Sequence, residues 1–266
     1  MPVTVRDVRA YKQRGERFSM LTAYDAAQAK LLDDAGIPVL LVGDTLAMVM
    51  LGHPDTVPVT MDQMLHHTAA VVRGARNALV VGDMPFMSYQ ASVEDGMRNA
   101  GRFLKEAGAK AVKLEGGRAV LELVGRLTES GIPVMGHLGL TPQSVNQLGG
   151  YRVQGRSVEH AERILRDAKD LEAAGIFALV LEAVPEDLAR DVTASLEVPT
   201  IGIGAGPHCD AQVLLFHDFL GIAVTEYSPK FVKRYASLGD AITRAAGEFA
   251  AEVASGAFPG PEHTYH

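Results

Sequence analysis

A repeated pattern of helix, glycine and apolar strand is the feature that most constrains the fold. It is clearest in four segments, "DDAGIPVLLVGD", "KEAGAKAVKLEG", "TESGIPVMGHLG" and "EAAGIFALVLEA". In each, a helical segment ends at a glycine that suits a left-handed C-cap, and an apolar strand follows within a few residues. Strands that are apolar throughout and alternate with helices indicate a parallel sheet covered by helices.

The number of such units predicts a closed barrel. Candidate strands lie at residues 18–23, 38–44, 78–85, 110–116, 133–139, 178–183, 199–205 and 220–226. Eight units in one chain of 266 residues predict an α/β protein with a (β/α)8 TIM barrel that forms a single domain over residues 1–266. The segment "DAITRAAGEFAAEVASGAF" predicts an extra C-terminal helix. A doubly wound open sheet is the alternative.

Composition and charge exclude several classes of partner. The chain has 25 Lys and Arg against 32 Asp and Glu, a formal charge of -7, and no basic stretch, so we expect no nucleic acid partner. Its single cysteine, Cys209, excludes an intrachain disulfide and a cysteine-based zinc site, which fits a reducing cytoplasm. We expect no membrane partner, because no signal-like segment and no apolar run of about 18 residues is present.

Polar side chains follow five neighbouring strands at the point where each strand ends. They are Asp44 after the second strand, Asp83 after the third, Lys113 and Glu115 late in the fourth, His137 in the fifth and Glu182 in the sixth. Because the active sites of such barrels lie at the C-terminal ends of the strands, we expect these side chains to converge on one rim.

Four carboxylates on one rim predict a bound cation. A single Asp after a strand commonly caps a helix or forms a turn. Several carboxylates close together repel one another, however, unless a cation lies among them. Oxygen ligands from two Asp and one Glu favour Mg²⁺ over zinc. Lys113 is placed to neutralise a substrate carboxylate, while His137 is equally suited to orienting a group on the rim and to a structural hydrogen bond.

Two of the loops that follow strands are unusually long. They span residues 45–59 and 140–157, and the second contains Gly149, Gly150 and Gly155. Long loops on this face of a barrel commonly bind substrate or cover the site, and glycines allow a loop to move. We therefore expect both loops to take part in binding.

The motifs together resemble those of a known enzyme family. In order they are "MLTAYDA", "LLVGDTLAMVMLGH", "VVGDMPFMSY", "AVKLEGG", "PVMGHLGLTPQ", "LVLEAVP", "IGIGAGPHCDAQVLL" and "EHTYH". This series, which spans nearly the whole chain, resembles the 3-methyl-2-oxobutanoate hydroxymethyltransferases, also called ketopantoate hydroxymethyltransferases. The resemblance implies a one-carbon transferase of pantothenate biosynthesis that uses 5,10-methylenetetrahydrofolate and 3-methyl-2-oxobutanoate to form 2-dehydropantoate.

The resemblance also implies a fold, a cofactor, an assembly and a set of site residues. The fold is a (β/α)8 barrel of the phosphoenolpyruvate/pyruvate type, the cofactor is one Mg²⁺ per subunit, and the assembly is a homo-oligomer, a decamer. The implied metal ligands are Asp44, Asp83 and Glu115. The implied substrate contacts are Asp44, Thr45, Asp83 and Lys113, and the implied catalytic base is Glu182.

The implied chemistry proceeds through an enolate. A 2-oxo acid that chelates Mg²⁺ has a more acidic proton at C3, and Glu182 is expected to remove it. The chain departs from the family at Thr45, where Ser is common, and at Ala47, where Gly is common. The added methyl groups narrow the loop and bear on which oxo acids fit.

Two other functions compete with this interpretation. One is a Mg²⁺-dependent 2-oxo-acid lyase or mutase of the phosphoenolpyruvate-mutase type, for which a cysteine or phosphate-directed groups are expected in a mobile loop. The loop at 45–59 contains no cysteine. The other is a non-catalytic barrel that binds a ligand or a partner. The acidic rim argues against it, because a scaffold needs no cluster of carboxylates.

Overall fold

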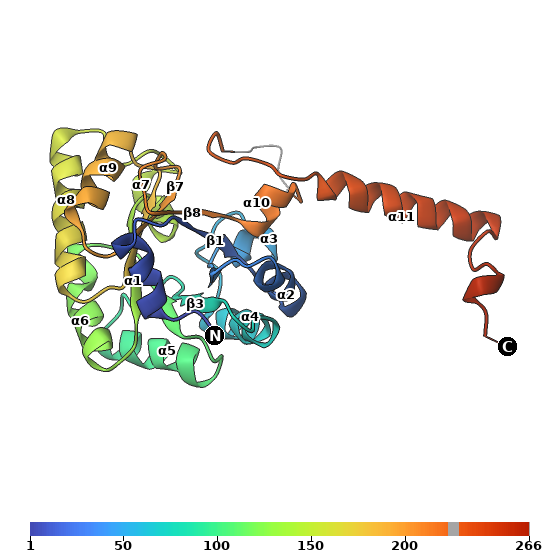
Figure 1. The fold of residues 1–266 in the computed structure, drawn as a ribbon, viewed down its shortest axis with the longest axis horizontal. Coiled ribbons are helices and arrows are strands. Elements are labelled where there is room, and N and C mark those ends of the chain that lie inside the picture. Colours follow the sequence, from blue (N-terminus) through green and yellow to red (C-terminus); the bar gives the residue numbers. More distant parts are fainter. Residues whose placement is uncertain (223–228, 266) are drawn as a thin grey trace. The chain divides into compact units, whose positions relative to one another are not determined.

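Eight parallel strands pair in chain order, and the pairing of β1 with β8 closes them into a barrel (Figure 1). The computed structural model describes residues 1–222 and 229–265. The strands are β1 (Phe18–Thr22), β2 (Val39–Val42), β3 (Leu79–Asp83), β4 (Ala111–Lys113), β5 (Val134–Gly139), β6 (Ala178–Glu182), β7 (Thr200–Ile203) and β8 (Ala211–Leu214). Closure confirms the predicted TIM barrel and excludes the open sheet.

Helices lie outside the strands (Figure 1). In the part of the chain that carries the barrel, Met1–Leu215, they are α1 (Val5–Gln13), α2 (Ala26–Asp34), α3 (Leu46–Val49), α4 (Met61–Gly74), α5 (Val93–Lys105), η1 (Arg118–Val120), α6 (Leu121–Glu129), η2 (Pro142–Ser144), α7 (Val145–Leu148), α8 (Val158–Ala173) and α9 (Glu186–Ser195). Side-chain caps fix several starts, because Asp25 accepts a hydrogen bond from the Gln28 amide and Ser92 accepts one from the Asp95 amide.

The barrel core consists of inward-facing apolar side chains from all eight strands, to which β4 contributes only the small Ala111. Its larger members are Phe18, Met20, Val39, Leu41, Leu79, Val81, Met135, Val180, Ile201, Ile203 and Val213. On the outer face, α5 packs very closely on β3. A Cβ atom at Gly82 would lie 2.4 Å from the Phe103 ring, so only glycine permits this approach.

Helix α1 covers the N-terminal end of the barrel. Its Val8 is fully buried and belongs to the same core cluster as Phe18 and Met20. Tyr11 stacks on Phe18 with ring centroids 4.9 Å apart. With this end filled by apolar side chains, the C-terminal ends of the strands are left to form a site.

The position predicted for the eighth strand was wrong. The strand that closes the barrel is β8, at Ala211–Leu214, and Leu220 ends a helix, whereas most of the predicted range 220–226 lies outside the described residues. Parallel strands are usually joined through a helix, but only residues 204–210 join β7 to β8. With no helical segment before it and an exposed Gln212 within it, β8 shows neither sign by which the other strands were found.

A second unit, Phe216–His266, contains α10 (Phe216–Leu220), α11 (Leu238–Ser255) and η3 (Pro261–His263). Helix α11 confirms the predicted C-terminal helix. Its C-cap is Gly256, which has the left-handed φ of 73° expected of a glycine at this position. None of the described helices has the length and apolar character that crossing a membrane requires.

Candidate active site

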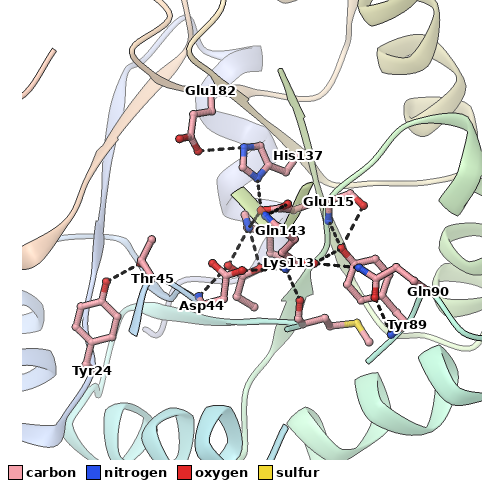
Figure 2. Close-up of polar contacts among 12 residues, drawn as sticks. Tyr24, Asp44, Thr45, Tyr89, Gln90, Lys113, Glu115, His137, Gln143 and Glu182 are labelled. Atoms are coloured by element: carbon pink, nitrogen blue, oxygen red, sulfur yellow. Dashed lines mark hydrogen bonds and ion pairs between the residues drawn. The ribbon is translucent and has the colours of Figure 1, made fainter. Parts of the chain in front are cut away.

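A polar pocket lies at the C-terminal ends of the strands (Figure 2). It is lined by every residue that the sequence predicted for the site, namely Asp44, Thr45, Asp83, Lys113, Glu115, His137 and Glu182. The rest of its wall is mainly apolar and includes Met20, Leu41, Val180, Ile203 and Val213. The prediction that these polar residues converge on one rim is therefore confirmed.

Lys113 and Asp83 form a buried ion pair. They are register partners at the ends of β4 and β3, which places their side chains next to each other. Lys113 Nζ lies 2.7 Å from Asp83 Oδ1 and 2.8 Å from Oδ2. Burial lowers the pKa of Lys113, but the surrounding carboxylates outweigh burial and raise it. Lys113 is therefore a fixed positive charge within the pocket.

Asp44 is a buried carboxylate whose negative charge has few compensating partners. It is 2% exposed, and Gln143 Nε2 donates to its Oδ2 at 2.9 Å. Its backbone N donates to Asp83 Oδ2 at 3.2 Å. In the described chain no basic side chain forms an ion pair with Asp44. Burial, together with the charges of Asp83 and Glu115, raises the pKa of Asp44 well above its usual value.

His137 lies between two carboxylates. Its Nδ1 is 3.4 Å from Glu115 Oε1, and its Nε2 is 3.3 Å from Glu182 Oε2. Burial and the nearby Lys113 lower the pKa of His137, but the two carboxylates outweigh them and raise it to about 9. Burial raises the pKa of Glu115, yet His137 and Lys113 outweigh burial and lower it. At neutral pH the ring is thus an imidazolium that links Glu115 to Glu182.

The backbone around Glu182 packs tightly against the end of β5. Glu182 ends β6 beside Gly139, the last residue of β5, and the Leu140 amide donates to the Glu182 carbonyl at 2.8 Å. A Cβ atom at position 139 would lie 2.2 Å from that carbonyl oxygen, and Gly139 has a φ of 94°, so this position requires glycine. Ala183 follows with a left-handed φ of 47°. This local strain directs the chain away from the strand immediately after Glu182.

Thr45 faces the pocket from the start of α3. Its hydroxyl does not cap the helix and instead lies 3.0 Å from the Tyr24 hydroxyl. Ala47 is fully buried two residues later. Of the two residues at which the sequence predicts a departure from the common family pattern, Thr45 therefore lines the pocket and Ala47 is buried.

The two long loops are partly helical and contact each other. The loop at 45–59 contains α3, and the loop at 140–157 contains η2 and α7. The Tyr151 hydroxyl donates to Met48 Sδ at 3.7 Å, which joins the two loops at the rim. Their proposed part in binding stays a prediction.

Sequence reasoning missed two residues of the site, Gln143 and Tyr89. The Gln143 side chain contacts Asp44, and the Tyr89 hydroxyl lies 3.2 Å from the Glu115 carbonyl oxygen. Neither residue carries a charge or ends a strand, so neither fits the pattern that identified the others. The long loop that contains Gln143 was the only signal.

The chemistry of the carboxylates fits a divalent cation with oxygen ligands. When ionised, Asp44, Asp83 and Glu115 carry three negative charges against two positive charges from Lys113 and His137. Glu115 Oε1 is buried and makes no hydrogen bond, although His137 Nδ1 lies 3.4 Å and Lys113 Nζ 3.9 Å from it. Within the described residues, no group of three or more Asp, Glu, His or Cys side chains has the geometry to coordinate a metal ion. The ligand candidates thus share a pocket without forming a complete coordination shell by themselves.

Solved structures with the same fold define the class. The chain aligns with phosphonopyruvate hydrolase in complex with oxalate and Mg²⁺ at a TM-score of 0.62 and 14% identity, covering 98% of this chain and 93% of that one. It aligns with 2,3-dimethylmalate lyase, a member of the PEP mutase/isocitrate lyase superfamily, at a TM-score of 0.62 and 16% identity, over 98% and 93% of the two chains. These likenesses define the class as a TIM barrel, here with an acidic site at the C-terminal rim.

Sequence comparison identifies the family within this class. The model of the ketopantoate hydroxymethyltransferase family matches residues 2–261. A 3-methyl-2-oxobutanoate hydroxymethyltransferase from Syntrophus aciditrophicus is 58% identical over 99% of this chain and 96% of that protein. One from Moorella thermoacetica is 59% identical over 99% and 97%. The chain belongs to the ketopantoate hydroxymethyltransferase family, with hydroxymethyl transfer in pantothenate biosynthesis as its activity. This confirms the resemblance and decides against the lyase and non-catalytic alternatives.

Proposed function

We propose that the chain transfers the one-carbon unit of 5,10-methylenetetrahydrofolate to C3 of 3-methyl-2-oxobutanoate, forming 2-dehydropantoate and tetrahydrofolate, at a site that holds one Mg²⁺. The observation that carries this proposal is the buried group of Asp44, Asp83 and Glu115 around one pocket with Lys113. Burial of several anions is costly unless a cation compensates them. A scaffold protein would have no use for such an arrangement.

Asp44, Asp83 and Glu115 are the proposed ligands of the metal. When bound, Mg²⁺ would polarise the 2-oxo group of the substrate and so acidify its C3 proton. Burial and acidic neighbours raise the pKa of Asp44, so a bound cation would stabilise its ionised form. Lys113 already pairs with Asp83 and supplies part of the required positive charge.

The proposed substrate contacts are Lys113, Thr45, Asp44 and Asp83. Of these, Lys113 would neutralise the substrate carboxylate. Lys113 keeps its proton because the surrounding carboxylates raise its pKa. The apolar wall of the pocket suits the branched alkyl group of the oxo acid. That wall includes Leu41, Val180 and Ile203, which lie on three different strands.

Glu182 is the proposed base that removes the C3 proton. Its side chain is 17% exposed, more than that of Glu115, and one of its oxygens faces the His137 imidazolium at 3.3 Å. His137 would hold the Glu182 carboxylate in place, and its contact with Glu115 would fix the orientation of the ring. His137 thereby serves as an orienting group in this proposal.

A Mg²⁺-dependent assay tests the proposed reaction. Purified protein with both substrates should form 2-dehydropantoate with added Mg²⁺ and lose this activity with a chelator. By calorimetry, Asp83→Ala should lose the Mg²⁺-dependent binding of 3-methyl-2-oxobutanoate. Unchanged affinity in this variant would contradict the ligand assignment.

The proposed assembly is a homodecamer in the cytoplasm, supported by membership of the family. Native mass measurement in solution tests the number of subunits. A monomer that is fully active would contradict the proposed assembly.

A further inference from the structure

The side-chain amide of Gln143 uses all of its hydrogen-bonding capacity inside the site (Figure 2). The residue is 4% exposed. Its Nε2 donates to Asp44 Oδ2 and to the Met84 carbonyl, both at 2.9 Å. Its Oε1 accepts from the Tyr89 hydroxyl at 2.8 Å and from Gln90 Nε2 at 3.0 Å. An amide offers two donor hydrogens and two acceptor positions, so all four are occupied.

Gln143 also binds a second acidic residue through its backbone. Its amide N donates to Glu115 Oε2 at 3.1 Å. Asp44 follows β2, Glu115 follows β4, and Gln143 lies in η2 after β5. One residue of the long loop at 140–157 therefore contacts two of the three proposed metal ligands, which come from two other strands.

The orientation of the Gln143 amide is determined by its neighbours on the far side. The Tyr89 phenol has one hydrogen to donate, and its oxygen lies 2.8 Å from Gln143 Oε1. Gln90 offers a second donor. A flipped Gln143 amide would place its NH₂ against these donors and its oxygen against the Asp44 carboxylate, which costs free energy on both sides.

We propose that Gln143 is a positioning residue, which holds Asp44 and Glu115 in the arrangement that receives the divalent cation. Its side-chain amide donates to one oxygen of Asp44, and its backbone donates to one oxygen of Glu115, whose other oxygen faces His137. Partners that orient ligand side chains in this way commonly change metal affinity by about 10- to 100-fold when they are removed. The inference rests on the proposed function, since it requires that these carboxylates bind a metal.

Mn²⁺ binding to the full-length protein without either substrate provides the test. The free Mn²⁺ signal in electron paramagnetic resonance gives the dissociation constant. Gln143→Met keeps the length of the side chain but forms none of the four hydrogen bonds, and we expect about 10- to 100-fold weaker binding. In assays, the Mg²⁺ concentration for half-maximal activity should rise by a similar factor, while kcat at saturating Mg²⁺ stays within about threefold. A merely structural role would lower kcat and leave the Mg²⁺ requirement unchanged.

A second variant and a matched control complete the test. Tyr89→Phe keeps Gln143 but removes a donor that orients its amide, and we expect about 3- to 10-fold weaker Mn²⁺ binding. This variant decides the question if Gln143→Met does not fold. Gln154→Met changes a glutamine of the same loop whose side chain, among the described residues, donates only to the Arg152 carbonyl, and it should bind Mn²⁺ like the wild type.

The outcomes separate this inference from the proposed function. Wild-type protein that binds one Mn²⁺, with the binding lost in Asp83→Asn, supports the metal site itself. Unchanged Mn²⁺ affinity in folded Gln143→Met, or in Tyr89→Phe if the former does not fold, would then overturn the role of Gln143 alone. Wild-type protein without Asp83-dependent binding would overturn the metal site and this inference together.

Discussion

The two ends of the barrel treat buried carboxylates in opposite ways. At the N-terminal end, Asp33 of α2 accepts hydrogen bonds from the backbone N of Arg76 at 3.1 Å, of Asn77 at 2.9 Å and of Ala78 at 2.6 Å, just before β3. Asn77 Nδ2 donates as well, at 3.1 Å. Burial raises the pKa of Asp33, but these donors outweigh burial and lower it.

Other acidic residues do the same at this end. Asp210 accepts from the Thr200 amide at 2.8 Å and pairs with Lys12 at 3.1 Å. Glu172 accepts from the amides of Glu197 at 2.7 Å and of Val198 at 2.8 Å. Each of these carboxylates satisfies backbone groups at the start of a strand, where no helix or sheet partner is available.

At the C-terminal end, Asp44 faces acidic neighbours and has the amide of Gln143 as its donor, and its pKa is raised. The difference teaches how to distinguish structural from functional acids. Where backbone donors surround the carboxylate, its burial stabilises the fold. Where other carboxylates surround it, burial lowers stability, and the arrangement indicates a function that needs the charge.

The largest expected effect is on turnover at the C-terminal end. Glu182→Gln removes the proposed base and should lower kcat by about 10²- to 10⁴-fold, because general base catalysis contributes that much. Exchange of the C3 proton of 3-methyl-2-oxobutanoate in D₂O with Mg²⁺ and without folate, followed by NMR, measures the step directly. Glu186→Gln is the control, since Glu186 also pairs with a histidine, His208, but on the surface. Undiminished exchange in Glu182→Gln would reject the assignment.

At the N-terminal end the largest effect is on stability. Asp33→Asn replaces one acceptor oxygen by an NH₂ group that faces backbone donors, and we expect the free energy of unfolding to fall by about 3 kcal/mol. Urea denaturation at one fixed protein concentration measures it. The neighbouring Asp34→Asn, which breaks only an exposed pair with Lys30, should change stability by less than about 0.5 kcal/mol. Equal effects of the two variants would contradict the structural role of Asp33.

The stability supplied by Asp33 should also depend on pH. Its pKa in the folded state lies below the unfolded value of about 3.9. Its contribution is therefore complete above that unfolded value and is lost as the pH falls through the folded pKa. The difference in unfolding free energy between wild type and Asp33→Asn should be constant from about pH 5 to 8 and shrink below about pH 4. A difference that grows in acid would contradict a lowered pKa of Asp33 in the folded state.

The corresponding substitution at the C-terminal end, Asp44→Asn, should raise the free energy of unfolding instead of lowering it. Asp44→Asn removes a buried charge that Asp83 and Glu115 repel, and it leaves an oxygen for Gln143 to bind. In a buffer with a chelator, we expect the free energy of unfolding to rise by about 1 kcal/mol, while Mg²⁺-dependent substrate binding is lost. Thermal unfolding and calorimetry measure the two effects. A destabilised Asp44→Asn would break the contrast between the two ends.

The smallest expected effect concerns substrate range. Thr45→Ser together with Ala47→Gly removes one methyl group from a residue that lines the pocket and one from a buried residue. The kcat/KM for bulkier 2-oxo acids, relative to 3-methyl-2-oxobutanoate, should rise by about 2- to 10-fold. Steady-state assays with a series of oxo acids test this, with each single variant as control. An unchanged ratio would show that these positions do not limit the substrate.

Much of the fold and the rim was predictable, because local signals carry it. Glycine C-caps and apolar strands indicated the repeating units, and polar residues at strand ends indicated the side of the barrel on which Asp44, Asp83 and Glu182 would meet. The position of β8 was not predictable in this way, since residues 204–210 form no helix between β7 and β8. Gln143 and Tyr89 were missed because an uncharged side chain acquires its role only from the groups that surround it.

The sequence by itself determined the class of fold, the acidic rim and, through its motifs, the family. These depend on periodicity and on residue type, which are properties of short segments. Only the tertiary structure decided how each buried charge is compensated: Asp33 by backbone donors, Asp83 by Lys113, and Asp44 by the amide of Gln143. Compensation depends on distances between residues far apart in the chain, and closure of the barrel sets those distances.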